Sequence, residues 1–303
     1  MSSYQNEITP LIHIVNDYQC VLGEGPVWDA KRSSIIWLDI IKGNIHEYNT
    51  SNSVFNTIAV HQMIGSFALC ENGHFVAALQ QGLYFINKVT GEQKMIAQPE
   101  IHLPQNRFND GKCDPAGRFW AGTMNIKDEV GAGSVYLLDK KEQLSKMIEQ
   151  VTISNGLAWS LDHKTLYYID TPTYEIVAYD YDLVSGQINN KRVVINFEKA
   201  EGYPDGMTID TEGMLWIAHW GGWQVSRWDP NTGKKLSYFK LPVEKVTSCT
   251  FGGENYTDLY ITSAKVGLSD QELQQQPLAG SLFVIPSCGF KGIAPIEFQG
   301  VGF

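Results

Sequence analysis

The fold can be read from the segment Val151-Thr-Ile-Ser-Asn155-Gly-Leu-Ala-Trp-Ser160. A polar residue, Asn155, stands directly before a glycine, and a short apolar run typical of a strand follows. A turn-like stretch and a second strand, Thr165–Asp170, come next. The same pattern of polar residue, strand, turn and strand recurs five more times, with three close copies and two weaker ones, which start at Glu24, Asn109, Asp205, Ser66 and Ser248.

The spacing of these copies predicts the architecture. The second strand of each copy carries one aromatic or aliphatic anchor, and the six anchors are Trp37, Val76, Trp120, Tyr168, Trp216 and Tyr260. Subtracting neighbouring positions gives spacings of 39, 44, 48, 48 and 44 residues. Periods of this length, each with several short strands, are typical of β-propeller blades. We therefore predict an all-β, six-bladed β-propeller, because a single large sandwich would not repeat one phrase six times.

The repeats fill most of the chain, which favours a single propeller domain over residues 1–303. One strand is expected near the N-terminus, at Leu11–Val15. A propeller leaves open sheet edges unless its ends share one blade, so this strand should pair with the last blade and close the ring. The tail, Gly292–Phe303, is expected to form a final strand with a frayed end.

Composition narrows the class of partner and the compartment. The net charge of −10 disfavours nucleic acid and anionic membranes as partners. The N-terminus lacks a signal-peptide pattern, and no apolar run is long enough for a membrane span. The five cysteines form no CxxC pair. We expect a cytoplasmic protein with reduced thiols, either a monomer or a weak homo-oligomer.

The equivalent polar positions of the six copies predict a site on the propeller axis. The first strand of each blade lines the channel, so these positions should lie at one level around it. Three of them, Glu24, Asn155 and Asp205, are strong oxygen donors. Two carboxylates and one amide oxygen suit a hard divalent cation and leave positions for water and substrate. Ca²⁺ is favoured, although the sequence does not separate it from Mg²⁺, Mn²⁺, Zn²⁺ or Fe²⁺.

An alternative interpretation of the same residues is purely structural. Asn-Gly and Asp-Gly pairs are common turn signals, so each copy taken alone could simply mark a turn. Both interpretations place these residues at the channel, and they differ on whether a metal binds. Arg107 lies two positions before Asn109, so on a strand the two side chains share a face. The Arg107 guanidinium could bind substrate oxygens, and Lys127 could reach a ligand from the long loop at 124–133.

At these residues the chain resembles the regucalcin (senescence marker protein)/gluconolactonase/luciferin-regenerating-enzyme family. The likeness covers nearly the whole chain, and its most specific motifs are Gly23-Glu24-Gly-Pro-Val-Trp28, Arg107-Phe-Asn109-Asp-Gly-Lys112, Asp114-Pro-Ala-Gly-Arg118, Ala121-Gly-Thr-Met124, Ile153-Ser-Asn155-Gly-Leu157, Pro204-Asp205-Gly-Met207, Leu241-Pro-Val243 and Lys291-Gly-Ile-Ala-Pro295. The resemblance implies one divalent metal held by Glu24, Asn155 and Asp205. It also implies sugar contacts from Arg107 and Asn109. Where animal members have an acidic residue that contacts the sugar, this chain has Lys127, which leaves the preferred sugar open.

The resemblance implies a hydrolase of carbohydrate metabolism that opens aldonolactones, such as gluconolactone, to the aldonic acid. Asp205 is the expected general base, because a ligand with a free second oxygen can accept a proton. Two alternatives stay open at this point. One is a related metal-dependent esterase or phosphotriesterase, and the other is a Ca²⁺-binding regulatory protein without enzymatic activity.

Overall fold

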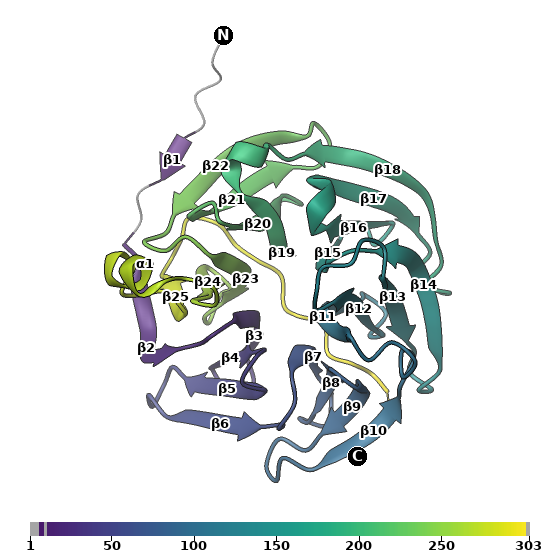
Figure 1. Cartoon of the computed structure of the whole chain (residues 1–303). Helices are drawn as coiled ribbons and strands as arrows, with labels where there is room; N and C mark the ends of the chain where they lie inside the picture. Colours follow the sequence, from purple (N-terminus) through teal and green to yellow (C-terminus); the bar gives the residue numbers. More distant parts are fainter. Residues whose placement is uncertain (1–5, 9–10, 301–303) are drawn as a thin grey trace.

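In the computed structural model, six sheets, antiparallel except for one short parallel strand at the edge of one sheet, surround a central channel (Figure 1). Five sheets have four strands and one has five, which confirms the predicted six-bladed β-propeller. The structure describes residues 6–8 and 11–300, and residues 1–5, 9, 10 and 301–303 lie outside it. Each blade begins with its innermost strand at the channel and proceeds outward.

The first three blades follow one another in the chain. Blade 1 consists of β3 (Gly23–Asp29), β4 (Ser34–Asp39), β5 (Asn44–Asn49) and β6 (Phe55–Ala59). Blade 2 consists of β7 (Ile64–Leu69), β8 (Phe75–Leu79), β9 (Gly82–Ile86) and β10 (Gln93–Ala97). Blade 3 consists of β11 (Asn106–Cys113), β12 (Phe119–Asn125), β13 (Gly133–Leu138) and β14 (Leu144–Val151).

The other three blades complete the ring. Blade 4 consists of β15 (Ser154–Trp159), β16 (Thr165–Asp170), β17 (Glu175–Tyr181) and β18 (Ile188–Asn196). Blade 5 consists of β19 (Tyr203–Ile209), β20 (Leu215–Trp220), β21 (Gln224–Asp229) and β22 (Lys234–Lys240). Blade 6 contains β23 (Val246–Gly252), β24 (Asp258–Ser263) and β25 (Ser281–Ile285).

Two N-terminal strands join blades from the other end of the chain. The strand expected at Leu11–Val15 lies at β2 (His13–Gln19), where it pairs antiparallel with β25 as the outer strand of blade 6. A further strand, β1 (Asn6–Ile8), pairs parallel with β22 at the edge of blade 5. Helical structure within the described ranges is limited to η1 (Thr171–Thr173), η2 (Lys199–Glu201) and α1 (Asp270–Gln275), and no helix there is long and apolar enough to cross a membrane.

The six anchors of the repeat form the layer between blades. Each lies on the second strand of its blade and is buried, with at most 4% of its surface exposed. In blades 3 and 5 the anchor also donates a side-chain hydrogen bond: Trp120 Nε1 donates to Asp114 at 3.0 Å, and Trp216 Nε1 donates to Asp210 at 2.9 Å. The repeated phrase therefore encodes both the packing between blades and the turn that follows each inner strand.

The C-terminal tail differs from the expectation of a final strand. Residues 286–300 run across the middle of the propeller (Figure 1). In place of a strand they form isolated bridges, of Gly292 with Asp210 and of Phe298 with Cys70. Asp210 and Cys70 directly follow the inner strands β19 and β7, so the tail covers the channel end at which the inner strands finish. It cannot join the outer edge of blade 6, the blade that it follows in the chain, because β2 already occupies that edge.

Phe298 anchors this tail, and its replacement by alanine should destabilise the protein by about 3–5 kcal/mol. The ring is fully buried between blades 2 and 3, 6.0 Å from the ring of Phe85. Urea unfolding of Phe298→Ala measures the loss. Ile296→Ala is the matched control in the same tail, because Ile296 is 39% exposed and should change the free energy of unfolding little. Equal effects of the two substitutions would contradict a role for Phe298 as the anchor.

Candidate functional site

All six inner strands are irregular at the same level of the channel. In each blade the pairing of the first and second strands shifts register at or next to the repeated polar position, and the shifts fall at Glu24/Val27, Ile64/Ser66, Phe108/Gly111, Asn155/Leu157, Pro204/Met207 and Val246/Ser248. Such β-bulges bend a strand and re-aim its side chains, and they are frequent beside functional sites. The repeated phrase thus forms a ring of bulges around the axis.

The glycines of the phrase lie within these strands, so the interpretation of Asn-Gly and Asp-Gly as turns is wrong. Neighbouring inner strands approach so closely here that a side chain would not fit. A Cβ added to Gly156 would lie 2.7 Å from Met207 Cβ, and one added to Gly206 would lie 2.9 Å from Ser248 Cα. Glycine is therefore required by close approach of the strands rather than by a turn.

A chain of hydrogen bonds joins three of the predicted site residues. Arg107 Nη1 donates to Asn109 Oδ1 at 2.7 Å, which confirms that these two side chains share a face. Asn109 Nδ2 in turn donates to Asn155 Oδ1 at 3.0 Å and to the Ser154 carbonyl at 2.8 Å. All three predicted residues are at least 91% buried. The contact brings the inner strands of blades 3 and 4 together at the site.

Buried carboxylates form the second part of the site. Burial raises the pKa of Glu24 to about 8, and the charge of Asp110 adds to this effect. Burial also raises the pKa of Asp205 well above its ordinary range, with further contributions from Glu24 and Asp110. Glu24 and Asp205, from blades 1 and 5, are thus close enough to interact, together with the unpredicted Asp110 on blade 3. Such a group of acids favours protons or a cation among them.

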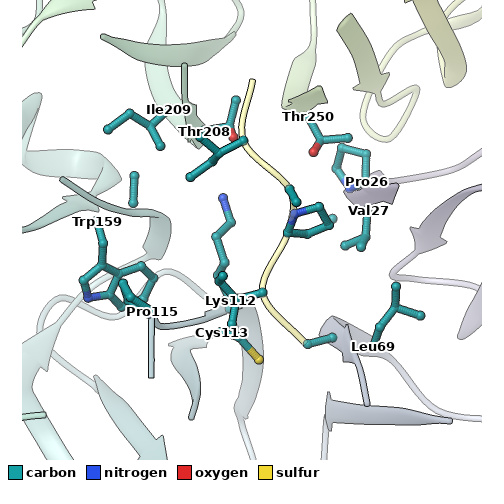
Figure 2. Close-up of a pocket in the computed structure, with 18 of the residues that line it drawn as sticks. Pro26, Val27, Leu69, Lys112, Cys113, Pro115, Trp159, Thr208, Ile209 and Thr250 are labelled. Carbon is teal, nitrogen blue, oxygen red and sulfur yellow. The ribbon is translucent and has the colours of Figure 1, made fainter. Parts of the chain in front are cut away.

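Two basic side chains partly offset this negative charge. The charge of Arg107 lowers the pKa of both Glu24 and Asp205. Lys112 acts from the other side, where its Nζ crosses the channel from blade 3 and donates to the Met207 carbonyl on blade 5 at 2.6 Å. Figure 2 shows this side chain reaching toward Thr208 inside a cavity of about 350 Å³, which the tail residues 293–297 cover. Glu24, Asp205 and Arg107 lie toward the opposite end of the channel, where the inner strands begin, whereas Asp110 also lines this cavity.

The long loop after β12 brings a second charged residue, Asp128, near the site. Lys127 is exposed, and its backbone N–H donates to Asn125 Oδ1 at 2.9 Å. Burial lowers the pKa of the Arg107 guanidinium to about 10, and the charge of Asp128, the neighbour of Lys127 with a left-handed φ of 56°, partly offsets this effect. A contact between Lys127 and a substrate stays a prediction.

A cleft opens next to Arg107 on the same face. It has a volume of about 290 Å³ and lies between blade 2 and the segment Gln98–Pro104. Glu100 holds this segment in place, because it accepts hydrogen bonds from Thr123 and Tyr136, each at 3.0 Å, and from Asn106 at 2.9 Å. The volume is near the lower end of the range for small-molecule sites, about 300–1,000 Å³.

The donor set fits a hard divalent cation by its chemistry. Within the described residues, no three His, Cys, Asp or Glu side chains group as a metal-ligand cluster. The predicted set contains only two carboxylates, and its third donor is the amide oxygen of Asn155, which has one lone pair left after its bond to Asn109. Two buried carboxylates with raised pKa values and an oriented amide oxygen are the ligands that Ca²⁺ or Mg²⁺ prefers.

The raised pKa of Glu24 predicts a pH dependence of the cation-free protein. The folded chain holds a proton on Glu24 up to pH of about 8, whereas the unfolded chain releases it near its ordinary pKa of 4.5. The folded state therefore binds more protons in this window, and this contribution to stability is lost as pH rises from about 4.5 through about 8. Urea unfolding in a chelator at several pH values measures it, as the difference between the wild type and Glu24→Gln.

The affinity of the protein for a cation should show the opposite dependence on pH. The cation must displace the proton of Glu24 below pH 8, so its affinity should rise with pH until that range and then level off. Calorimetric titration with Ca²⁺ at pH 6, 7 and 8 measures this trend. A stability difference between wild type and Glu24→Gln that stays constant with pH would contradict the assigned pKa.

Three residues near the site were absent from the sequence prediction. Asp110 and Lys112 lie in the motif that contains Asn109, and only the bulge at Phe108/Gly111 turns Asp110 toward the acids. Thr171 lies outside the repeated phrase, in η1, so no repeat marks it. Its hydroxyl accepts a hydrogen bond from Asn155 Nδ2 at 2.7 Å.

The sequence of this chain is similar to those of known proteins. The sequence profile of the SMP-30/Gluconolactonase/LRE-like region matches residues 22–265. Regucalcin from Gallus gallus is 46% identical over 286 residues, which are 92% of this chain and 95% of the relative.

Two solved structures are similar over nearly the whole chain. A luciferin-regenerating enzyme matches with a TM-score of 0.90 and 32% identity, covering 96% of this chain and 99% of its own. A calcium-binding protein, regucalcin, from Agrobacterium tumefaciens matches with a TM-score of 0.91 and 28% identity, covering 96% and 98%. The profile match and the identity to regucalcin show that the chain belongs to the SMP-30/gluconolactonase/LRE-like family, as its motifs indicate.

Proposed function

We propose that the protein is a divalent-metal-dependent lactonase that hydrolyses a sugar lactone to the aldonic acid. The observation that carries the proposal is the convergence, at one end of the channel, of two buried carboxylates with the amide oxygen of Asn155. That oxygen accepts a hydrogen bond from the amide of Asn109, which itself accepts one from Arg107. The family includes gluconolactonases by its description, and one similar structure is described as calcium-binding. Both facts support this chemistry for the site.

Glu24, Asn155 and Asp205 would hold the cation. When bound, a divalent cation supplies positive charge that keeps the buried carboxylates ionised and polarises a lactone carbonyl. Asp205 accepts the proton that an attacking water loses as its oxygen bonds to the carbonyl carbon. The bond from that carbon to the ring oxygen then breaks, and the ring oxygen takes up a proton to become a hydroxyl.

Arg107 and Asn109 bind the sugar in this proposal. Only Nη1 of Arg107 bonds to other residues within the described part of the chain, to Phe108 O and Asn109 Oδ1. The rest of its planar fork is available for substrate hydroxyls, and the cleft beside it leaves room for them. Lys127 is proposed as a further contact, from the exposed loop over the same face.

Acid release from a panel of aldonolactones tests the proposal. The protein is treated with a chelator, freed of it, and assayed with and without added Ca²⁺, Mg²⁺, Mn²⁺ or Zn²⁺. We expect hydrolysis of at least one aldonolactone that is lost on chelation and returns with a divalent cation. Activity that survives chelation would contradict metal dependence.

The same assay distinguishes the other two candidate functions. Aryl esters and organophosphate triesters are included, and faster turnover of these than of any lactone would assign an esterase or phosphotriesterase. Tight Ca²⁺ binding without turnover of any substrate, under any cation, would assign a Ca²⁺-binding regulator. We propose that the protein acts in the cytoplasm, as a monomer or a weak homo-oligomer.

A further inference from the structure

Asn155 holds its place through a hydroxyl on the neighbouring connection. Its Nδ2 donates to Thr171 Oγ1 at 2.7 Å, and that hydroxyl donates to the Pro204 carbonyl at 2.8 Å. Thr171 is 92% buried, and Pro204 directly precedes Asp205 in β19. One hydroxyl therefore links the side chain of one predicted ligand to the backbone beside another.

The direction of these bonds is fixed from both ends. The Pro204 carbonyl can only accept, so the single proton of the Thr171 hydroxyl points to it and the hydroxyl can only accept from Asn155. The atom of Asn155 that faces Thr171 must then be the nitrogen. At the other end Arg107 can only donate, so it faces the oxygen of Asn109, and the nitrogen of Asn109 donates to Asn155. Both ends require the same orientation of the Asn155 amide.

An amide side chain has no intrinsic preference between its two orientations, because oxygen and nitrogen exchange places by rotation about one bond. Only the oxygen can ligate a hard cation. We propose that Thr171 is a positioning residue that fixes the Asn155 amide with its oxygen available to the cation and ties it to the strand that carries Asp205. The inference rests on the proposed function, since it concerns the cation of that site.

The position of Thr171 is itself well determined. Its backbone N–H donates to the Ile153 carbonyl at 3.1 Å, and its carbonyl accepts from the Tyr174 N–H at 3.2 Å. The preceding Asp170 carboxylate accepts the N–H groups of Thr152 and Ile153 at 2.9–3.2 Å. The hydroxyl is thus held in place before any cation arrives, as expected for a residue that orients a metal ligand.

Thr171→Val removes the hydroxyl and keeps the shape of the side chain. Calorimetric titration of the chelator-treated protein with Ca²⁺, and with Mn²⁺ as a second probe, should show about 10- to 100-fold weaker binding than in the wild type. Thr171→Ser restores the hydroxyl and should bind within about threefold of the wild type. Thr171→Ala removes the hydroxyl without adding a methyl group in its place, in case valine disturbs folding.

Thr173→Val is the matched control. Thr173 lies in the same η1 turn, but it is exposed and its hydroxyl donates to the Asp170 carbonyl rather than contacting Asn155. This variant should bind both cations as the wild type does. Thermal unfolding in chelator reports any general loss of stability, and the rise in Tm on adding Ca²⁺ should be smaller in Thr171→Val than in Thr173→Val.

The outcomes separate this inference from the function on which it rests. If the wild type binds neither cation, the proposed metal dependence is wrong and the inference is wrong with it. If the wild type binds and Thr171→Val and Thr171→Ala bind equally well, only the role of Thr171 is overturned. Weak binding by Thr171→Ser as well would also overturn it, because the hydroxyl would then not be the cause.

Discussion

Replacing Asp205 by asparagine is expected to lower kcat/KM for the best aldonolactone by about 10²–10⁴-fold, the usual contribution of a general base. The amide keeps the shape of the side chain but cannot accept the proton of the attacking water. Affinity for Ca²⁺ should fall as well, because one of two charged ligands becomes neutral. Initial rates of acid release and calorimetric titration measure the two effects.

The same substitution should leave the cation-free protein equally stable or more stable. Asp205 is buried beside Glu24 and Asp110, and its pKa is raised well above the ordinary range because ionisation there is unfavourable. Asparagine removes that cost, so urea unfolding at pH 8 in chelator should require no less denaturant. If Asp205 acts in catalysis, its replacement lowers turnover and leaves the cation-free protein at least as stable. If it were a structural residue, its replacement would lower both turnover and stability.

Asp162→Asn serves as the control for this experiment. Asp162 is exposed in the turn between β15 and β16, where it accepts a hydrogen bond from Ser160. Its replacement should change neither turnover nor Ca²⁺ affinity. Normal turnover by Asp205→Asn would remove Asp205 from the mechanism, and a large loss of stability in chelator would indicate a structural role instead.

The fold could be predicted because the repeat expresses one physical requirement six times. Each blade needs a large buried anchor on its second strand, and Trp37, Trp120 and Trp216 make that position visible in the sequence. The tail carries no such repeat. The tail follows blade 6 in the chain, and the outer edge of that blade is occupied by β2, which comes from the other end of the chain.

The contact between Arg107, Asn109 and Asn155 could be predicted in part for a similar reason. Arg107 and Asn109 share a face by strand alternation, and the repeat places Asn155 in the equivalent position on the next blade. Asp110 would point to the other face of a regular strand. The bulge in β11 changes this, and a bulge is set by the approach of neighbouring strands rather than by local sequence.

Thr171 shows a different limit of the sequence. It enters the site through a connection between β16 and β17, whose path depends on how blades 4 and 5 pack. A threonine after a strand-ending aspartate has no distinctive pattern. Contacts that depend on the placement of two blades relative to each other can be found only in three dimensions.

Replacing Arg107 is expected to give the second large effect. Turnover should fall, whereas the affinity for Ca²⁺ should not. Arg107→Met should lower kcat/KM by about 100-fold, since the loss of charged hydrogen bonds costs about 1.5–3 kcal/mol each. Affinity for Ca²⁺ should stay the same or rise. The guanidinium charge acts on Glu24 and Asp205, so its removal leaves more negative charge for the cation.

The pattern across variants distinguishes a substrate contact from a support of the cation site. Arg107→Lys keeps the charge and loses the planar fork, so it should restore the Ca²⁺ affinity of the wild type but little of the turnover. Arg192→Met is the matched control, because Arg192 forms an exposed ion pair with Asp180 at 2.7 Å and should affect neither quantity. If Ca²⁺ affinity falls together with turnover in Arg107→Met, the residue acts by holding Asn109 and Asn155 in place for the cation. Arg107 is 91% buried, and that burial lowers its pKa to about 10. Burying this charge destabilises the folded protein, and binding of the substrate is the function that would explain why the charge is kept there.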